Sequence, residues 1–153
     1  MLLRTSDPKA KLTSLEVARA SVLGWCIEWL QAFFLVADDV MDDSETRRGS
    51  PCWYKQPHVG MISINDSFLL ESFVFTILKS HFGSEPSYTR LLHLFIDVIQ
   101  QTEFGQLLDL TSQPQNAPVD LNRFTLERYR LIVQVSTLTR ARAPSHTYLW
   151  SRT

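Results

Sequence analysis

The distribution of glycine and proline constrains the fold of this chain more than any other feature. The 153 residues include 5 glycines and 7 prolines, which gather between long stretches where apolar residues recur at helical spacing. The longest stretch, residues 14–43, contains one glycine and no proline. This pattern predicts an all-α fold in which long helices are joined by short loops.

Four main helices are expected from these stretches. Thr13 or Ser14 is a suitable N-cap for the first helix, and Asp120 is suitable for the fourth. The connector "RRGSPCWYKQPHVG" is rich in turn residues, and its Trp53 and Tyr54 are expected to pin it to the helices. The predicted helices cover about residues 14–43, 63–82, 87–112 and 121–133.

The end of the chain has a different composition. No acidic residue occurs from Arg128 onward, and the helical pattern gives way to Ser, Thr, Arg and a proline. We therefore expect an irregular, poorly ordered tail. The predicted organisation is a partial domain over residues 1–134, followed by a divergent tail over residues 135–153.

Charge and cysteine content limit the class of partner and the compartment. The 15 basic and 16 acidic side chains nearly cancel, so no global field attracts nucleic acid. Cys26 and Cys52 lack the spacing of a disulfide framework or zinc site, which suits a reducing compartment. With no apolar signal-peptide core and no run near the ~20 apolar residues of a membrane span, a soluble cytoplasmic protein is expected.

Acidic side chains gather at the end of the first predicted helix, in "ADDVMDDSETRRG". The helix macrodipole is negative at this end and disfavours them. Asp38 and Asp42 are four residues apart, so they share one face and repel each other. Mg²⁺ prefers oxygen ligands and is typically held by one or two carboxylates together with substrate phosphates. The spacing therefore predicts a metal, and the metal predicts a phosphate-bearing ligand.

Residues around these aspartates extend the predicted site. Gln31 lies two turns before Asp38 on the same face, with Phe34 one turn before it and Phe33 beside Phe34. This face suits a ligand that has an apolar tail and an anionic head. Arg47 and Arg48 follow in the loop, where guanidinium groups can bind diphosphate oxygens bidentately.

Three other interpretations of the acidic segment are a solvated helix end, an EF-hand and a di-iron bundle. The sequence pattern does not exclude a solvated helix end with local Asp–Arg pairs. Such pairs would contribute little to the free energy of folding. An EF-hand is poorly supported because Val40 falls where its loop needs Asp or Asn. A di-iron bundle is disfavoured because the chain contains no Glu-x-x-His pair.

A polar stripe marks the third predicted helix. Thr102, Gln106 and Asp109 follow i, i+4, i+7 spacing on an otherwise apolar segment. Gly105 costs about 1 kcal/mol relative to Ala within a helix, which suggests close approach by a helix or a ligand. The stripe either faces water or, if this helix lies against the first, lets Gln106 and Asp109 bind metal waters as outer ligands.

Several motifs together resemble a known family. They are "LGWCIEWLQAFFLVADDVMDDSETRRGSPCWYK", "INDSFLLES", "TEFGQLLDLTSQP" and "VDLNRF". In this order they resemble the trans-prenyltransferases, or polyprenyl synthetases, and among these the eukaryotic farnesyl diphosphate synthases. The resemblance covers about residues 20–133 and implies the N-terminal half of an isoprenoid-synthase-type helical bundle.

The resemblance implies roles for the acidic and basic residues. Asp38, Asp39 and Asp42 match the first aspartate-rich motif, with Asp38 and Asp42 as Mg²⁺ ligands. Arg47 matches the contact to the allylic diphosphate, which would be dimethylallyl or geranyl diphosphate. The contacts to isopentenyl diphosphate would be Gln31 and Arg48.

The resemblance also implies a product and an assembly. Phe33 and Phe34 occupy positions that close the tail pocket at farnesyl length, and Gln106 and Asp109 match the family's Gly-Gln-x-x-Asp segment. The implied reaction ionises the allylic diphosphate, forms a bond to isopentenyl diphosphate and releases a proton. Farnesyl diphosphate made in this way serves isoprenoid and sterol biosynthesis, and the family implies a homodimer.

Three departures from the family bear on activity. The family's upstream Gly-Gly-Lys-x-x-Arg-Gly segment is absent. Where the family has an aromatic-Lys-Thr helix, this chain has Gln134, Val135 and Ser136. No second aspartate-rich motif is present. These departures suggest a truncated chain with weak or no turnover. The alternative is a non-catalytic partner that dimerises with or regulates a full-length synthase. A terpene cyclase ranks lower because it needs neither "TRRG" nor "GQLLD".

Overall fold

The computed structural model describes the backbone of residues 11–112 and 125–136. The chain divides into two compact units, Met1–Ile96 and Asp97–Thr153. The first unit contains the acidic segment and the connector that follows it, so it holds most of the predicted site residues.

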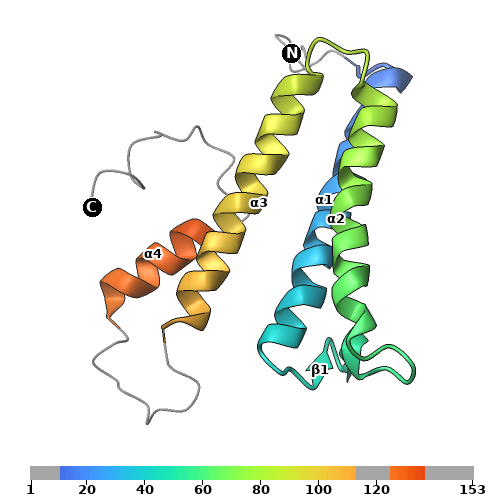
Figure 1. Cartoon of the computed structure of the whole chain (residues 1–153). Coiled ribbons are helices and arrows are strands. Elements are labelled where there is room, and N and C mark those ends of the chain that lie inside the picture. Colours follow the sequence, from blue (N-terminus) through green and yellow to red (C-terminus); the bar gives the residue numbers. More distant parts are fainter. Residues whose placement is uncertain (1–10, 113–124, 137–153) are drawn as a thin grey trace. The chain divides into compact units, whose positions relative to one another are not determined.

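Within the described residues, four helices confirm the predicted all-α class (Figure 1). The predicted bounds of the first three helices agree with the observed ones to within two residues, whereas the fourth helix begins at Leu126, five residues later than predicted. The connector contains three short elements that were not predicted, namely a minimal two-stranded hairpin and one turn of 3-10 helix. The elements are α1 (Ser14–Met41), β1 (Thr46–Arg47), β2 (Ser50–Pro51), η1 (Trp53–Lys55), α2 (Ile62–Phe82), α3 (Tyr88–Leu110) and α4 (Leu126–Ser136).

Helix α1 begins with a capping box, which confirms Thr13 as its N-cap. The Thr13 hydroxyl accepts the backbone N–H of Glu16 at 3.2 Å, and the Glu16 carboxylate accepts the backbone N–H of Thr13 at 2.8 Å. The box satisfies two backbone donors that a helix start leaves unpaired. This end of α1 is therefore completed by residues within one turn of it.

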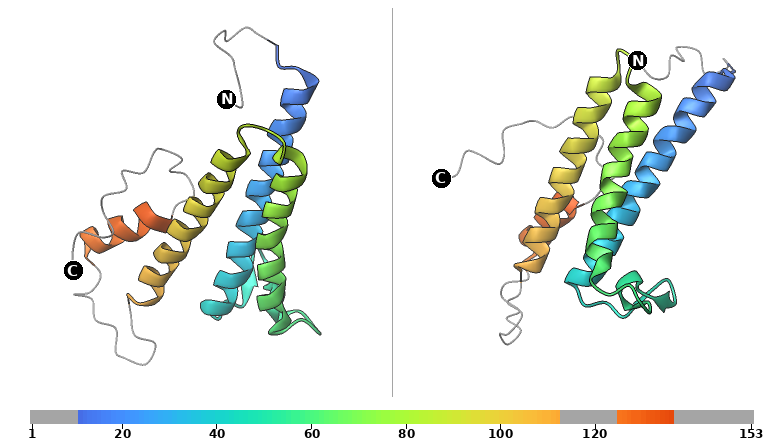
Figure 2. Two further views of the ribbon diagram at one scale, coloured as in Figure 1. Left: turned by 45° about the horizontal axis from the view of Figure 1, so that its top comes forward. Right: turned by 45° about the vertical axis from the view of Figure 1, so that its right-hand side comes forward.

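Helices α1 and α2 run side by side in opposite directions and form the main packing contact of the first unit (Figures 1 and 2). Trp29 of α1 and Phe73 of α2 meet edge to face, with ring centroids 5.6 Å apart. Burial of apolar side chains on both helices fixes their relative register. The buried apolar residues of α1 and α2 are Cys26, Leu30, Phe33, Val74, Leu78 and Phe82.

Helix α1 is also long and apolar enough to cross a membrane by length and composition. Only 17% of its most apolar 18-residue window is buried. A core helix or a signal sequence meets the same criteria, so this is weak support for a span. The sequence had predicted no run of this kind, and the absence of a membrane span stays a prediction.

Helix α4 begins at Leu126, and Thr125 is its N-cap. The Thr125 hydroxyl accepts the backbone N–H of Arg128 at 3.1 Å. Asp120, which was predicted to cap this helix, lies outside the described residues. Helix α4 continues past residue 134, where the sequence predicted a division. The tail from residue 137 onward is not described, so that division stays a prediction.

Candidate functional site

The C-terminal end of α1 closes in a Schellman motif built on Asp43. Asp43 has a φ of 50°, in the left-handed region, and its N–H donates to the Val40 carbonyl at 3.4 Å. The N–H of Ser44 donates to the Asp39 carbonyl at 2.9 Å. These two bonds are those of a Schellman ending, in which the left-handed position is more often glycine. They turn the chain sharply away from the helix axis.

The chain then folds back through the β1–β2 hairpin. Arg48 and Gly49, the two residues of its turn, have φ values of 54° and 80°, as a two-residue type I′ turn requires. Arg47 pairs with Ser50 across the hairpin, and the N–H of Cys52 donates to the Glu45 carbonyl at 3.1 Å. The tight turn returns Arg47 to the end of α1.

Arg47 supplies the positive charge that the acidic helix end lacks. Its Nε donates to Asp39 Oδ1 at 2.9 Å, and its Nη2 lies 3.2 Å from Asp38 Oδ2. The hydrogen bond to Asp39 raises the pKa of Arg47. Asp–Arg pairs do form here, as one interpretation of the sequence allowed. However, Asp39 is only 3% exposed, so the pair is not a simple solvated helix end.

Cys52 completes the buried side of this cluster, and sequence reasoning missed it. Its side chain is fully buried. Burial raises the pKa of the thiol, and hydrogen bonding to the Asp39 carboxylate raises it further. Asp39 thus interacts with both Arg47 and Cys52. A lone cysteine in a turn-rich connector gives no sequence signal of such a contact.

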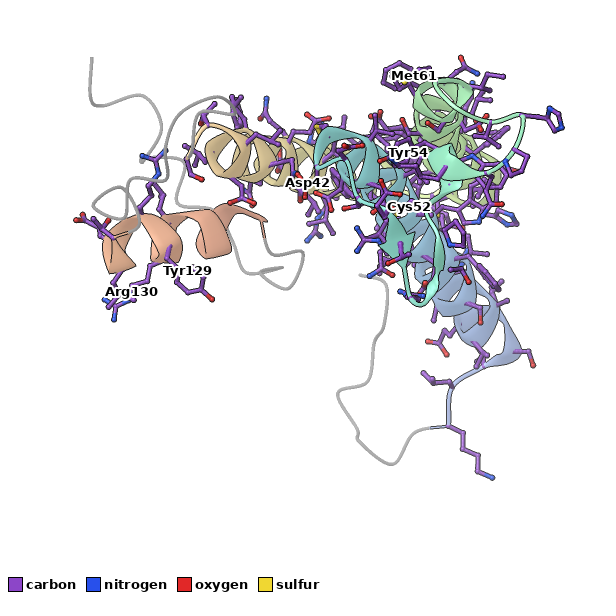
Figure 3. The ribbon with its side chains drawn as sticks, turned by 90° about the horizontal axis from the view of Figure 1, so that it is seen from below. Asp42, Cys52, Tyr54, Met61, Tyr129 and Arg130 are labelled. Atoms are coloured by element: carbon purple, nitrogen blue, oxygen red, sulfur yellow. The ribbon has the colours of Figure 1, made fainter. Side chains whose placement is uncertain are left out.

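Two aromatic residues of η1 attach the connector to the helices on either side of it. Trp53 Nε1 donates to Asp66 Oδ2 of α2 at 2.8 Å, and the Tyr54 hydroxyl donates to Asp43 Oδ1 at 2.9 Å. These contacts confirm that Trp53 and Tyr54 pin the connector to both helices. Figure 3 shows the chain from below, where Asp42, Cys52 and Tyr54 are labelled near the end of α1.

Lys55 adds a charged contact to the same attachment. Its Nζ lies 3.2 Å from Asp43 Oδ1 and 2.8 Å from Glu45 Oε1. The hydrogen bond from Tyr54, followed by that from Lys55, lowers the pKa of Asp43. Hydrogen bonding to Glu45 is the main cause that raises the pKa of Lys55. Asp43, for which the sequence predicted no role, therefore joins the end of α1 to η1.

Asp38 and Asp42 are the carboxylates best placed to hold a metal. They lie one turn apart on α1, and both have solvent-accessible side chains. Asp38 Oδ2 also lies 3.2 Å from Arg47 Nη2, so a metal ion would share this carboxylate with the guanidinium. Among residues 11–112 and 125–136, no three His, Cys, Asp or Glu side chains gather as a metal site. Two carboxylates of this kind fit a hard divalent ion whose remaining ligands are water and phosphate.

The residues one and two turns below the aspartates divide into buried and exposed positions. Phe33 is buried and Phe34 is half-buried, with ring centroids 4.6 Å apart and planes inclined by 44°. Gln31 is exposed. The two rings contact each other one turn before the acidic end, and their role in closing a tail pocket stays a prediction. The ligand contact assigned to Gln31 stays a prediction.

The polar stripe of α3 lies in the second unit. Gln106 is half-buried, Asp109 is exposed and Gly105 is buried. The Thr102 hydroxyl donates to the Val98 carbonyl of its own helix at 2.8 Å, a local bond common for threonine in helices. The outer-ligand role of Gln106 and Asp109 stays a prediction.

Comparison with known proteins gives one consistent result. Residues 4–149 match the polyprenyl synthetase family. The farnesyl pyrophosphate synthase of Kluyveromyces lactis is 53% identical over 136 residues, which cover 89% of this chain and 39% of that protein. Farnesyl pyrophosphate synthase 1 of Cannabis sativa is 56% identical over 128 residues, covering 83% of this chain and 37% of the relative. The chain thus spans about two-fifths of the relatives' length.

Solved structures agree with the sequence matches. The T. brucei farnesyl diphosphate synthase has a TM-score of 0.72 and 42% identity, over 75% of this chain and 36% of that one. The same enzyme complexed with a bisphosphonate has a TM-score of 0.69 and 40% identity, over 75% and 35% of the two chains.

Proposed function

Because this chain belongs to the polyprenyl synthetase family, we propose that its acidic segment and arginine hairpin serve Mg²⁺-dependent prenyl transfer. The substrates would be an allylic diphosphate and isopentenyl diphosphate, and the product would be farnesyl diphosphate for isoprenoid and sterol biosynthesis. One observation carries the proposal, namely that the β1–β2 hairpin brings Arg47 against Asp38 and Asp39. Positive and negative groups thereby meet at one helix end, as a metal-bound diphosphate requires.

Asp38 and Asp42 would hold the metal in this proposal. Mg²⁺, when bound, supplies positive charge that stabilises the diphosphate as it leaves the allylic carbon. Asp39 is buried and bound to Arg47, so it has a different part, which is to orient the guanidinium. The three aspartates of the motif thus divide into two metal ligands and one orienting group.

Arg47 and Arg48 would bind the two diphosphates. Arg47 is half-buried and held by carboxylates, whereas Arg48 is exposed in the hairpin turn. A guanidinium can donate two parallel hydrogen bonds to a diphosphate without losing its charge. The T. brucei synthase structure with a bisphosphonate supports this part of the proposal, because two linked phosphonates resemble a diphosphate chemically.

Phe33 and Phe34 would line the apolar end of the substrate site. Their rings lie 4.6 Å apart, with Phe34 half-buried and Phe33 buried. An apolar surface excludes water from the positive charge that develops on the allylic carbon. It would also limit the length of the prenyl tail, which is consistent with a farnesyl product.

A turnover assay tests the proposal. The chain is incubated with geranyl and isopentenyl diphosphates and Mg²⁺, and farnesyl diphosphate is measured. The sequence predicts weak turnover for these 153 residues, so binding of geranyl diphosphate is measured in parallel by calorimetry. Mg²⁺-dependent binding that is lost in Asp38→Ala supports the proposal. Geranyl diphosphate affinity that is the same with and without Mg²⁺, and the same in Asp38→Ala, contradicts the proposal.

A second candidate function is association with another copy of a synthase, and exposed apolar side chains favour it. Trp25 is 64% exposed on α1, and Phe68 is 60% exposed on α2. Large apolar groups in such positions often mark a protein interface. Sedimentation tests this idea, because a chain that stays monomeric at about 10 μM, well above typical dimer dissociation constants, argues against it.

The compartment is also part of the proposal. Cys26 and Cys52 are both free and buried in the described structure. Free thiols suit a reducing compartment such as the cytoplasm. Fluorescence microscopy of the tagged chain tests this location, which a membrane or secretory pattern would contradict.

A further inference from the structure

We propose that Asp43 is a positioning residue for the arginine hairpin and not a further metal ligand. Asp43 is adjacent to Asp42 in "DDVMDD", so a role in metal binding is the simplest assumption. The inference rests on the proposed function, because it concerns how Arg47 and Arg48 are placed for a diphosphate. It gives Asp43 a role that no sequence motif indicates, with Tyr54 as its partner.

The backbone at Asp43 separates it from the two aspartates proposed to hold the metal. Asp38 lies within α1 and Asp42 is the C-cap, with helical φ and ψ of −90° and 0°. Asp43 has already left the helix, with a φ of 50°. Even in a continued helix, Asp43 would lie about 100° around the axis from Asp42, so it does not share the face of Asp38 and Asp42.

The side chain of Asp43 already has two partners. Its Oδ1 accepts the Tyr54 hydroxyl at 2.9 Å and lies 3.2 Å from Lys55 Nζ. The ammonium of Lys55 offsets the negative charge that a metal ion would require. To bind a metal ion, Asp43 would therefore have to release its contacts with Tyr54 and Lys55.

The Asp43–Tyr54 bond closes the base of the hairpin. These residues are eleven positions apart, and β1, β2 and both arginines lie between them. Fixing the two ends of a loop reduces the conformations of every residue inside it. Holding Arg47 and Arg48 in place before a ligand arrives lowers the entropy lost on binding.

The same contacts contribute little to folding stability. The side chain of Asp43 is 83% exposed, and exposed ion pairs are worth little. Substitutions at Asp43 and Tyr54 should therefore leave the chain folded. This separates a positioning role from a structural one.

Four single variants and the double variant Asp43→Gly/Tyr54→Phe test the proposal. Asp43→Gly removes both side-chain contacts and keeps the left-handed backbone without strain. Asp43→Asn also tolerates that backbone and keeps an oxygen that can accept from Tyr54. Tyr54→Phe removes the hydrogen bond from the opposite side. The matched control is Glu28→Gln, which removes one exposed charge from α1 away from the hairpin.

The first measurement is amide hydrogen exchange at Cys52, whose N–H bonds to Glu45 within the closed segment. We expect exchange to be about fivefold faster in Asp43→Gly and in Tyr54→Phe, the factor that one hydrogen bond typically gives. Asp43→Asn should keep most of the protection of the Cys52 amide from exchange. Glu28→Gln should exchange at the rate of the parent chain. Unchanged exchange in Asp43→Gly overturns the proposal.

The second measurement is the affinity for inorganic diphosphate with Mg²⁺, alongside the affinity for Mn²⁺ alone. If Asp43 positions the hairpin, Asp43→Gly and Tyr54→Phe should each weaken diphosphate binding about fivefold. The double variant should bind diphosphate no more weakly than either single variant, because both substitutions remove the same contact. The affinity for Mn²⁺ should be unchanged in all three variants. A loss of Mn²⁺ affinity in Asp43→Gly and Asp43→Asn, with none in Tyr54→Phe, overturns the proposal in favour of a metal ligand.

The two measurements keep this inference apart from the proposed function. If the unsubstituted chain does not bind diphosphate, the proposed function is contradicted, and so is a role for Asp43 in diphosphate binding. If the chain binds diphosphate and Asp43→Gly binds it equally well, only the positioning role fails.

Discussion

The two ends of α1 differ in how their unpaired groups are satisfied. At the N-terminal end, Thr13 and Glu16 cap each other across one turn. At the C-terminal end, the last turn has no basic residue, and the compensating charge comes from Arg47 in the hairpin. The first end is complete in itself, whereas the second is completed by a separate segment that also carries Arg48.

This difference indicates where function is located on the helix. A reciprocal cap uses both of its side chains to begin the helix, so it has no capacity for a ligand. The C-terminal end concentrates carboxylates where the macrodipole disfavours them. Such an arrangement costs stability and is understandable at a binding site, where a cation and a phosphate offset the repulsion.

The largest expected effect is the loss of ligand binding at one end only. Asp38→Asn should weaken Mg²⁺-dependent diphosphate binding by about 100-fold, because it removes one of two charged ligands of a hard cation. Glu16→Gln removes a carboxylate from the other end and should leave this affinity unchanged. Calorimetric titration measures both. Equal losses in the two variants would mean that the ends do not differ in function.

The next effect concerns the buried carboxylate. Arg47→Met should destabilise the chain by about 3 kcal/mol, because Asp39 loses its charged partner while it remains buried. Urea unfolding measures this change. Adding Asp39→Leu to Arg47→Met should recover part of the loss, since no buried charge remains. A single variant as stable as the parent chain would argue against the importance of this pair.

A smaller effect is expected at the capped end. Thr13→Ala should lower the free energy of unfolding by about 1 kcal/mol, the usual cost of removing an N-cap side chain. Diphosphate affinity should not change, because the cap lies at the far end of α1. A loss of affinity in this variant would show that the two ends are coupled.

The smallest effect is a pH dependence shared by both ends. Bonds with Thr13 lower the pKa of Glu16, and bonds from Tyr54 and then Lys55 lower that of Asp43. A carboxyl whose pKa is lower in the folded state contributes stability at neutral pH and loses it as the pH falls through that pKa. The stability difference between Tyr54→Phe and the parent chain should therefore shrink as the pH falls below about 4. A difference that stays constant from pH 7 to pH 2 contradicts this assignment.

Sequence periodicity was sufficient to predict the helices and the residues at the acidic end. Helical spacing depends on local geometry, so α1, α2 and α3 were placed within a few residues, and Asp38 and Asp42 were placed on one face. The attachment of the connector by Trp53 and Tyr54 was also predicted and is confirmed. These features depend on residues that are close in the sequence.

The hairpin contacts could not be predicted in the same way. The pairing of Arg47 with Asp39 depends on left-handed conformations at Asp43 and Arg48, where most sequences place glycine. The burial of Cys52 beside Asp39 depends on the same fold of the connector. Periodicity contains no information about such turns, so the contact of the buried Asp39 with Arg47 emerged only from the structure.

The most direct test of the central claim is a calorimetric titration of the chain with inorganic diphosphate, with and without Mg²⁺. If the acidic end of α1 and the arginine hairpin form one site, diphosphate should bind in the presence of Mg²⁺ and should bind at least tenfold more weakly without it, a difference of about 1.4 kcal/mol. Equal affinity in the two conditions, or no binding in either, would contradict the claim.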